Sequence, residues 1–194
     1  MPNWCENRLT ITHKDADVID NLMAQVRSDE DERLFQHIKP MPDELRNTVV
    51  GTGQDEQTTK YDGHTNWYDW SCDNWGTKWD ACHLSWSQID DNTIEFDFDT
   101  AWSPPFGVYE ALAEQGFTVE AYYVEYGMMF AGEWYWDADN PYEEGDYDYL
   151  NDYCPENEHS GNISEYVPEG ADKVFGITEQ LAEWAEEEKE YADA

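Results

Sequence analysis

The chain has 194 residues, of which 10 are Lys or Arg and 45 are Asp or Glu, so its formal net charge at pH 7 is −35. This charge disfavours direct binding to nucleic acid and to anionic membrane surfaces, because both need clustered basic side chains. Hydrophobic residues make up 40% of the chain, which argues against wholesale disorder. There is no signal-peptide pattern, no apolar run of membrane-spanning length and no paired spacing of the four cysteines. We therefore expect a folded cytoplasmic protein with reduced thiols.

The first third of the chain predicts one strand and one helix. Residues 6–13 alternate like a half-buried strand, with Leu9 and Ile11 on one face. Asp15 can cap the helix that follows. Residues 34–42 have the pattern of a short extended segment that two prolines end, and residues 47–66 that of a long loop. The apolar residues of the predicted helix recur at helical spacing: Val18, Ile19, Leu22, Met23 and Val26.

The middle of the chain predicts two hairpins around a helix. A turn at Asp91-Asn92 joins strands over residues 82–90 and 93–102, and a turn at Gly127 joins strands over 117–127 and 128–137. Between them, residues 103–116 predict a helix with Ser103 as its cap and the prolines in its first turn. The order β-α-loop-β-β-α-β-β predicts an α+β fold of the ferredoxin-like kind, an antiparallel sheet with helices on one face. The cleanest strand alternates Ile94, Phe96 and Phe98 with Glu95, Asp97 and Asp99.

The composition changes after residue 136. We predict two parts: a folded domain over residues 1–136, and an acidic, Tyr-rich extension over 137–194 with a terminal helix over about 178–191. The acidity of the extension is compatible with low-complexity disorder, while its Tyr and Trp residues are compatible with docking on the sheet.

The segment DNWGTKWDA (residues 73–81) contains the candidate site Trp75, Lys78, Trp79 and Asp80. These side chains could form a ligand-binding aromatic box, on one side of a helical turn or around a tight loop opened by Gly76. Alternatively, Trp75 and Trp79 could clasp Lys78 as an internal counter-charge, because a cation gains energy over an indole ring. The second interpretation makes the segment a structural signature, with Lys78 paired to a carboxylate such as Asp73, Asp80 or Asp99.

The remaining motifs favour neither a metal nor an enzyme. Cys72, Cys82 and His83 lack the ligand spacing of a zinc site, and the acidic run from Asp137 has Tyr142 where a calcium loop needs glycine. The five histidines show no pairing with a nucleophile. We therefore expect no cofactor, no metal and no catalytic residue.

Five segments in order closely resemble the Api92-like family of phage and plasmid proteins, which carry a YubB ferredoxin-like domain: PNWCENRLTIT, HIKPMPDEL, DNWGTKWDA, FDFDTAWSPP and YVEYGMMFAGEW. The resemblance covers roughly residues 1–136. It implies a ferredoxin-like domain, a mobile genetic element as its origin and the cytoplasm of a bacterial host as its location. It implies no biochemical activity.

The acidic surface is the remaining functional signal. Carboxylates can imitate phosphates, and interleaved aromatic side chains can anchor a protein interface. We expect a basic nucleic-acid-binding host protein as the partner, which the chain would inhibit as a nucleic-acid mimic. Another protein-interaction role, a ligand site around Trp75 and Trp79, or an acidic surface adapted to salt are the alternatives. The predicted partner-binding residues are Asp137, Asp139, Tyr142, Glu143, Glu144, Asp146, Tyr147, Asp148 and Asp152.

Overall fold

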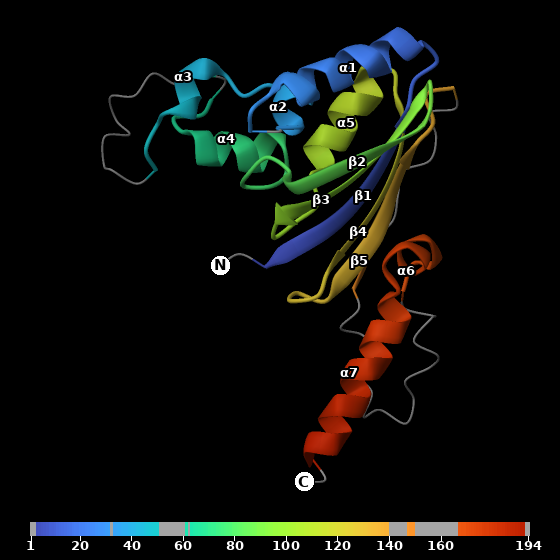
Figure 1. Cartoon of the computed structure of the whole chain (residues 1–194). Helices are drawn as coiled ribbons and strands as arrows, with labels where there is room; N and C mark the ends of the chain where they lie inside the picture. Colours follow the sequence, from blue (N-terminus) through green and yellow to red (C-terminus); the bar gives the residue numbers. More distant parts are fainter. Residues whose placement is uncertain are drawn as a thin grey trace.

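The computed structural model describes residues 3–31, 33–50, 61, 63–139, 147–149 and 167–192. In these ranges, six antiparallel strands form one sheet in the order β2-β3-β1-β4-β5-β6 (Figure 1). The predicted order of strands and helices is confirmed, with short elements added to it. The elements are β1 (Trp4–Thr12), α1 (Ala16–Ser28), α2 (Phe35–Ile38), α3 (Asp43–Arg46), α4 (Trp67–Asn74), β2 (Cys82–Asp90), β3 (Thr93–Ala101), α5 (Phe106–Glu114), β4 (Thr118–Glu125), β5 (Phe130–Trp136), β6 (Tyr147–Tyr149), α6 (Glu169–Phe175) and α7 (Ile177–Ala192).

Alternation along the strands gives the sheet a buried face and an open face. Leu9, Ile11 and Phe96 are fully buried. The residues that alternate with them along β1 and β3 keep contact with solvent. Helices α1, α2 and α5 cover the buried face (Figure 1) and join these strand residues in one apolar cluster. The predicted α+β, ferredoxin-like fold is thereby confirmed. The buried residues of α1 are Ile19, Leu22, Met23 and Val26, which belong to the predicted apolar set.

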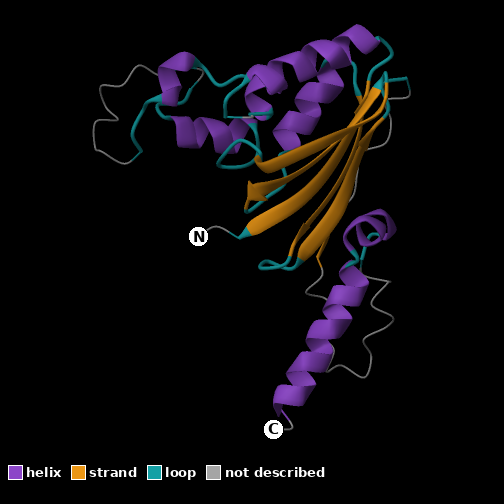
Figure 2. Ribbon diagram, in the orientation of Figure 1, coloured by secondary structure: helices purple, strands orange, loops and turns teal. Residues whose placement is uncertain are grey.

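The C-terminal helices lie on the other side of the sheet, at its β4–β5 end (Figure 2). Ala171 of α6 packs with Val124 of β4 and Ala131 of β5. Helix α7 then leads away from the sheet (Figure 1), and Trp184 contacts Tyr126 with a distance of 5.3 Å between the ring centroids. The predicted terminal helix is confirmed, and β6 and α6 both pack on the sheet. None of the helices in the described ranges combines the length and apolarity needed to cross a bilayer.

Two local predictions are wrong. Residues 34–42 include helix α2 instead of an extended segment, because the Asp80 carboxylate accepts hydrogen bonds from the backbone at the start of that helix. Helix α5 begins only at Phe106, after Pro105, so the prolines precede its first turn. Ser103 does not cap this helix, since its hydroxyl donates to the carbonyl oxygen of Gly76 at 2.6 Å.

Candidate functional site

The open face of the sheet carries acidic side chains at alternating positions of its central strands. The register places Glu95, Thr10 and Glu120 in one row across β3, β1 and β4. The next row along the strands contains Asp97, Arg8 and Tyr122. All of these side chains keep contact with solvent, because α1, α2 and α5 lie behind the sheet. Helix α6 covers the β4–β5 side of this face, where Gly170 lies beside Tyr122 and Glu133. We call the following six residues the carboxylate face: Glu6, Glu95, Asp97, Asp99, Glu120 and Glu133.

Arg8 is the base at the centre of the carboxylate face. Its Nε lies 2.8 Å from Oδ1 of Asp97 and 3.9 Å from Oε1 of Glu95. The hydrogen bond to Asp97 raises the pKa of Arg8. This pair is partly exposed, so we expect it to stabilise the fold by less than about 1 kcal/mol. One guanidinium leaves most of the surrounding negative charge uncompensated.

Glu6 and Asp99 occupy directly opposite positions on β1 and β3. Partial burial and the neighbouring Asp99 raise the pKa of Glu6 above its ordinary value. On its other side, Oδ2 of Asp99 lies 2.7 Å from Nδ1 of His83. The two carboxylates therefore repel each other in the free protein, and a cation from outside would relieve that repulsion.

The charge density of the carboxylate face lies in the range of a nucleic acid. Residues two apart on a strand are separated by about 6.8 Å, so the three rows span about 14 Å. Projected on the strand axis, the six carboxylates and one guanidinium of these four strands give about one net negative charge per 3 Å. Duplex DNA carries one charge per about 1.7 Å of its axis, and each strand one per about 3.4 Å.

The predicted partner-binding residues of the extension are placed only in part. Asp137 is half-buried and accepts a hydrogen bond from the backbone N–H of Asp139, which is exposed, at 2.9 Å. Tyr147 and Asp148 belong to β6, opposite Gly132 and Ala131 of β5. Their role in binding stays a prediction. The remaining members lie outside the described residues: Tyr142, Glu143, Glu144, Asp146 and Asp152.

The sequence reasoning missed Glu6, Glu120 and Arg8 as members of an acidic surface. The alternation of Glu95, Asp97 and Asp99 was a usable signal, since alternate residues of a strand share one face. That these residues meet Glu6 and Glu120 follows only from the strand order β3-β1-β4.

Lys78 is held by aromatic rings, but by a different set from the one predicted. Its Nζ lies 4.5 Å from the ring centroid of Trp79, 5.3 Å from that of Trp102 and 5.7 Å from that of Tyr68. Trp75 does not take part in this clasp: its ring packs on Trp70, with 5.5 Å between the centroids. Gly76, at a φ of 85°, forms the tight loop that separates Trp75 from Lys78.

The predicted ion pair of Lys78 is also wrong. Among the described residues no carboxylate lies within 4.0 Å of its Nζ. The candidates have other partners: Asp73 bonds to His64, and Asp99 bonds to His83. The charge of Lys78 is therefore available to a group from outside this segment.

Asp80 ties the segment to the core. Its Oδ1 accepts hydrogen bonds from the backbone N–H groups of Leu34, Phe35 and Ala81 at 2.8–2.9 Å, and its Oδ2 accepts one from Gln36 at 2.9 Å. Burial raises the pKa of Asp80, while these four donors act in the opposite direction. The carboxylate thus substitutes for a local cap at the start of α2.

A cavity of about 360 Å³ opens beside this segment. Its wall contains three indoles, two guanidiniums and the lysine, although the molecule as a whole is strongly acidic. Trp75 is 5% exposed, and its Nε1 donates to the carbonyl oxygen of Lys39 at 2.8 Å, so this indole is a fixed part of the wall. The lining residues are Arg33, Gln36, Met41, Arg46, Asn47, Trp67, Trp75, Lys78, Trp79 and Asp80, and we call the space the indole–arginine cavity.

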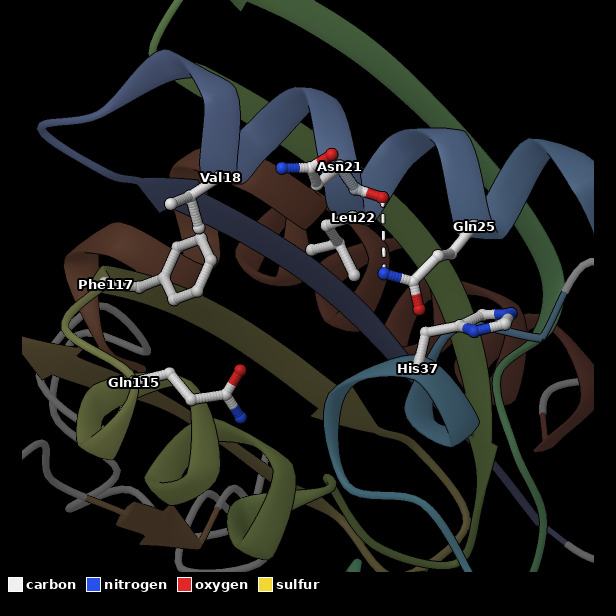
Figure 3. A pocket seen from close by; sticks show the side chains of 7 residues that line it. All are labelled: Val18, Asn21, Leu22, Gln25, His37, Gln115 and Phe117. Atoms are coloured by element: carbon white, nitrogen blue, oxygen red, sulfur yellow. Dashed lines mark hydrogen bonds between the residues drawn. The ribbon is translucent and has the colours of Figure 1, made fainter.

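A second cavity, of about 370 Å³, lies between α1, α2 and the end of α5 (Figure 3). Its polar groups already have partners in the protein: His37 Nε2 lies 3.0 Å from Oδ2 of Asp29, and Gln115 donates to the carbonyl oxygen of Ile38 at 3.0 Å. Figure 3 shows an apolar side formed by Val18, Leu22 and Phe117, with amides around it. We assign this cavity no role. The lining residues are Val18, Asn21, Leu22, Gln25, His37, Gln115 and Phe117.

The three cysteines that the structure describes are placed as structural thiols. Burial raises the pKa of Cys72 and of Cys82, and it raises that of the fully buried Cys5 far more. These thiols therefore stay protonated at neutral pH and are weak nucleophiles. In the described part of the chain, no group of three or more His, Cys, Asp or Glu side chains is arranged to hold a metal ion.

Residues 78–164 match the family model for the ferredoxin-like domain in Api92-like protein. This part of the chain is similar to the ferredoxin-like domain of Api92-like proteins, as the resemblance of the sequence segments predicts. The crystal structure of protein Api92 from Yersinia pseudotuberculosis is similar with a TM-score of 0.48 and 11% sequence identity, over 75% of this chain and 98% of that one. No curated protein matches the chain. The family model runs past residue 136, so the match includes the first part of the predicted extension.

Proposed function

We propose that the chain is a phage- or plasmid-encoded acidic protein that binds a basic nucleic-acid-binding protein of its host and thereby blocks access of nucleic acid. The contact would be made by the carboxylate face. The observation that carries this proposal is the set of six carboxylates around a single arginine on the open side of the sheet.

The physical argument is one of complementary charge. A protein that binds nucleic acid presents clustered Lys and Arg side chains. A rigid surface with about one net negative charge per 3 Å offers such a cluster the counter-charges that phosphates would supply. A total charge of −35 also speeds the encounter and makes it strongly dependent on salt.

Aromatic groups on the same face can add contacts that phosphates do not provide. Tyr122 donates its hydroxyl hydrogen to Oε1 of Glu120 at 2.7 Å, and its ring packs beside Gly170 of α6 at the edge of the acids. Tyr135 lies opposite Glu120 on β5 and is 37% exposed. Tyrosine is frequent at the energetically dominant positions of protein interfaces.

The test is affinity capture from a bacterial lysate at low salt, with the wild-type chain and two variants of equal net charge. The face variant is Glu6→Gln, Glu95→Gln and Asp99→Asn. The control variant is Asp20→Asn, Glu110→Gln and Glu114→Gln, which changes exposed acids on α1 and α5.

The proposal expects a nucleic-acid-binding protein that the wild type and the control variant capture, that the face variant loses, and that added DNA or RNA displaces. Capture of no nucleic-acid-binding protein would overturn the function. Equal loss of capture in both variants would overturn the carboxylate face as the contact surface. Binding would then depend only on the net charge of the chain. Stability that rises in molar salt, without any captured partner, would favour salt adaptation instead.

A further inference from the structure

We propose that the indole–arginine cavity binds a small organic anion that carries a flat aromatic ring. This site is separate from the carboxylate face, and the inference does not depend on the proposed function. Its starting point is where the scarce bases lie. Only 10 of the 194 residues are Lys or Arg, and three of them, Arg33, Arg46 and Lys78, line this one cavity.

The two arginines keep donors for a ligand. Arg33 uses Nε and Nη2 to bind the carboxylate of Asp29, at 3.0–3.3 Å. The Nε of Arg46 lies 3.3 Å from Oδ1 of Asp43. Within the described residues, Nη1 of both guanidiniums lacks a protein acceptor. Guanidinium groups bind carboxylates and phosphates through pairs of N–H donors, so two of them in one wall favour an oxyanion.

Arg46 is also held in position. When the Gln36 amide is oriented so that its oxygen faces donors, this oxygen accepts from Nη2 of Arg46 at 2.8 Å and from the backbone N–H of Met41 at 3.0 Å. A guanidinium fixed at Nη2 and Nε loses little freedom when a ligand binds. The fold has therefore already restricted the Arg46 side chain, and ligand binding costs little further conformational entropy.

The one acid in the cavity wall does not oppose this assignment. Asp80 directs both carboxylate oxygens to backbone N–H groups, four in total. Lys78 lies over three aromatic rings and has no carboxylate within 4.0 Å among the described residues. The lining residues themselves are three bases and one acid, while Asp29 and Asp43, outside the lining, each pair with one of the arginines.

The indoles select a flat ring. Trp67 and Trp79 are half-buried, so each keeps part of its surface open, while Trp75 is fixed by its hydrogen bond to Lys39. Planar rings stack on indole faces, as nucleobases do on aromatic side chains. A volume of about 360 Å³ lies within the range of about 300 to 1,000 Å³ that small-molecule sites occupy. A nucleic-acid polymer is disfavoured, because its further phosphates would meet a molecule with a net charge of −35.

The test uses adenosine 5′-monophosphate as the probe, with adenosine and inorganic phosphate as separate arms, measured by isothermal titration calorimetry on the full chain. We expect the nucleotide to bind at least tenfold more tightly than either arm. The variant Arg46→Gln should weaken nucleotide binding at least fivefold. The matched control is Arg27→Gln. Arg27 lies over the indole of Trp86, with 4.6 Å between its Cζ and the ring centroid, and it does not line this cavity.

Thermal unfolding of both variants establishes that they are folded, and Arg46 suits the purpose because its side chain is 38% exposed. No nucleotide binding at millimolar concentration would overturn the proposal. If adenosine bound as tightly as the nucleotide, the ligand would not need its anionic group. If Arg27→Gln weakened nucleotide binding as much as Arg46→Gln, the site would not lie in this cavity. Because partner capture tests a different surface, its failure would leave this result unaffected.

Discussion

Asp80 is the side chain on which the packing of the Trp-rich segment depends most directly, and its replacement by alanine should destabilise the fold. Four backbone N–H groups would lose their acceptor. An unsatisfied buried donor costs about 1 to 3 kcal/mol, and the adjoining cavity lets water reach some of the four. If two of them stay dry, the free energy of unfolding falls by about 3 kcal/mol. At about 2 to 4 °C per kcal/mol for a chain of this size, Tm falls by about 6 to 12 °C.

The measurement is thermal unfolding followed by circular dichroism, with Asp73→Ala as the control in the same segment. Asp73 has a side chain that is 72% exposed and, within the described residues, bonds only to His64, so its loss should cost less than about 1 kcal/mol. Asp80→Asn should lie between wild type and Asp80→Ala, because the amide keeps one oxygen but turns an NH2 group toward the remaining N–H donor. If Asp80→Ala melts within 2 °C of Asp73→Ala, the capping argument is refuted.

Two further predictions concern charge and pH. Glu6→Gln should stabilise the chain at pH 7 by about 0.2 to 1 kcal/mol, because it removes the repulsion with the opposite Asp99. Because the pKa of Glu6 in the folded state is raised above 4.5, this gain in stability should vanish as the pH falls through the raised pKa. Urea titrations at pH 7 and pH 4 measure the gain. A loss of stability at pH 7 would contradict the prediction. Asp29→Asn should destabilise the chain by about 2 kcal/mol at pH 7, because the hydrogen bonds of Arg33 lower the pKa of Asp29, whose side chain is 6% exposed. That difference should shrink as the pH falls below 3.8, and a difference that persists at pH 2 would exclude the ion pair as its cause.

The fold could be predicted where its information is local. In β3 the buried Ile94, Phe96 and Phe98 alternate with acids, and this period of two is visible in the sequence itself. Helix α2 was missed because its acceptor, Asp80, lies 45 residues from Phe35 in the chain. A helix of four residues has too few apolar positions to show a period of its own.

The candidate sites are less predictable for a related reason. The indole–arginine cavity takes Arg33, Arg46 and Trp67 from three segments that are separate in the sequence. Only Trp75, Lys78, Trp79 and Asp80 are neighbours along the chain, and they alone suggested a site. Even there, local spacing could not show that Trp75 turns toward Trp70 while Lys78 turns toward Trp102.

The pairing of Glu6 with Asp99 favours the proposed acidic interface over adaptation to salt. Like charges at directly opposite strand positions destabilise a sheet, and the pKa of Glu6 is raised first by its partial burial and then by the neighbouring Asp99. The same face carries Thr12 opposite Thr93, with 3.2 Å between the hydroxyl oxygens, so neutral pairs fit this sheet. Adaptation to salt needs only exposed acids, which single positions on α1 and α5 already provide. A repulsive pair on a rigid sheet is expected where a local cost is offset by function, because a basic partner would remove the repulsion on binding. Glu6→Gln should therefore raise stability and weaken partner capture together.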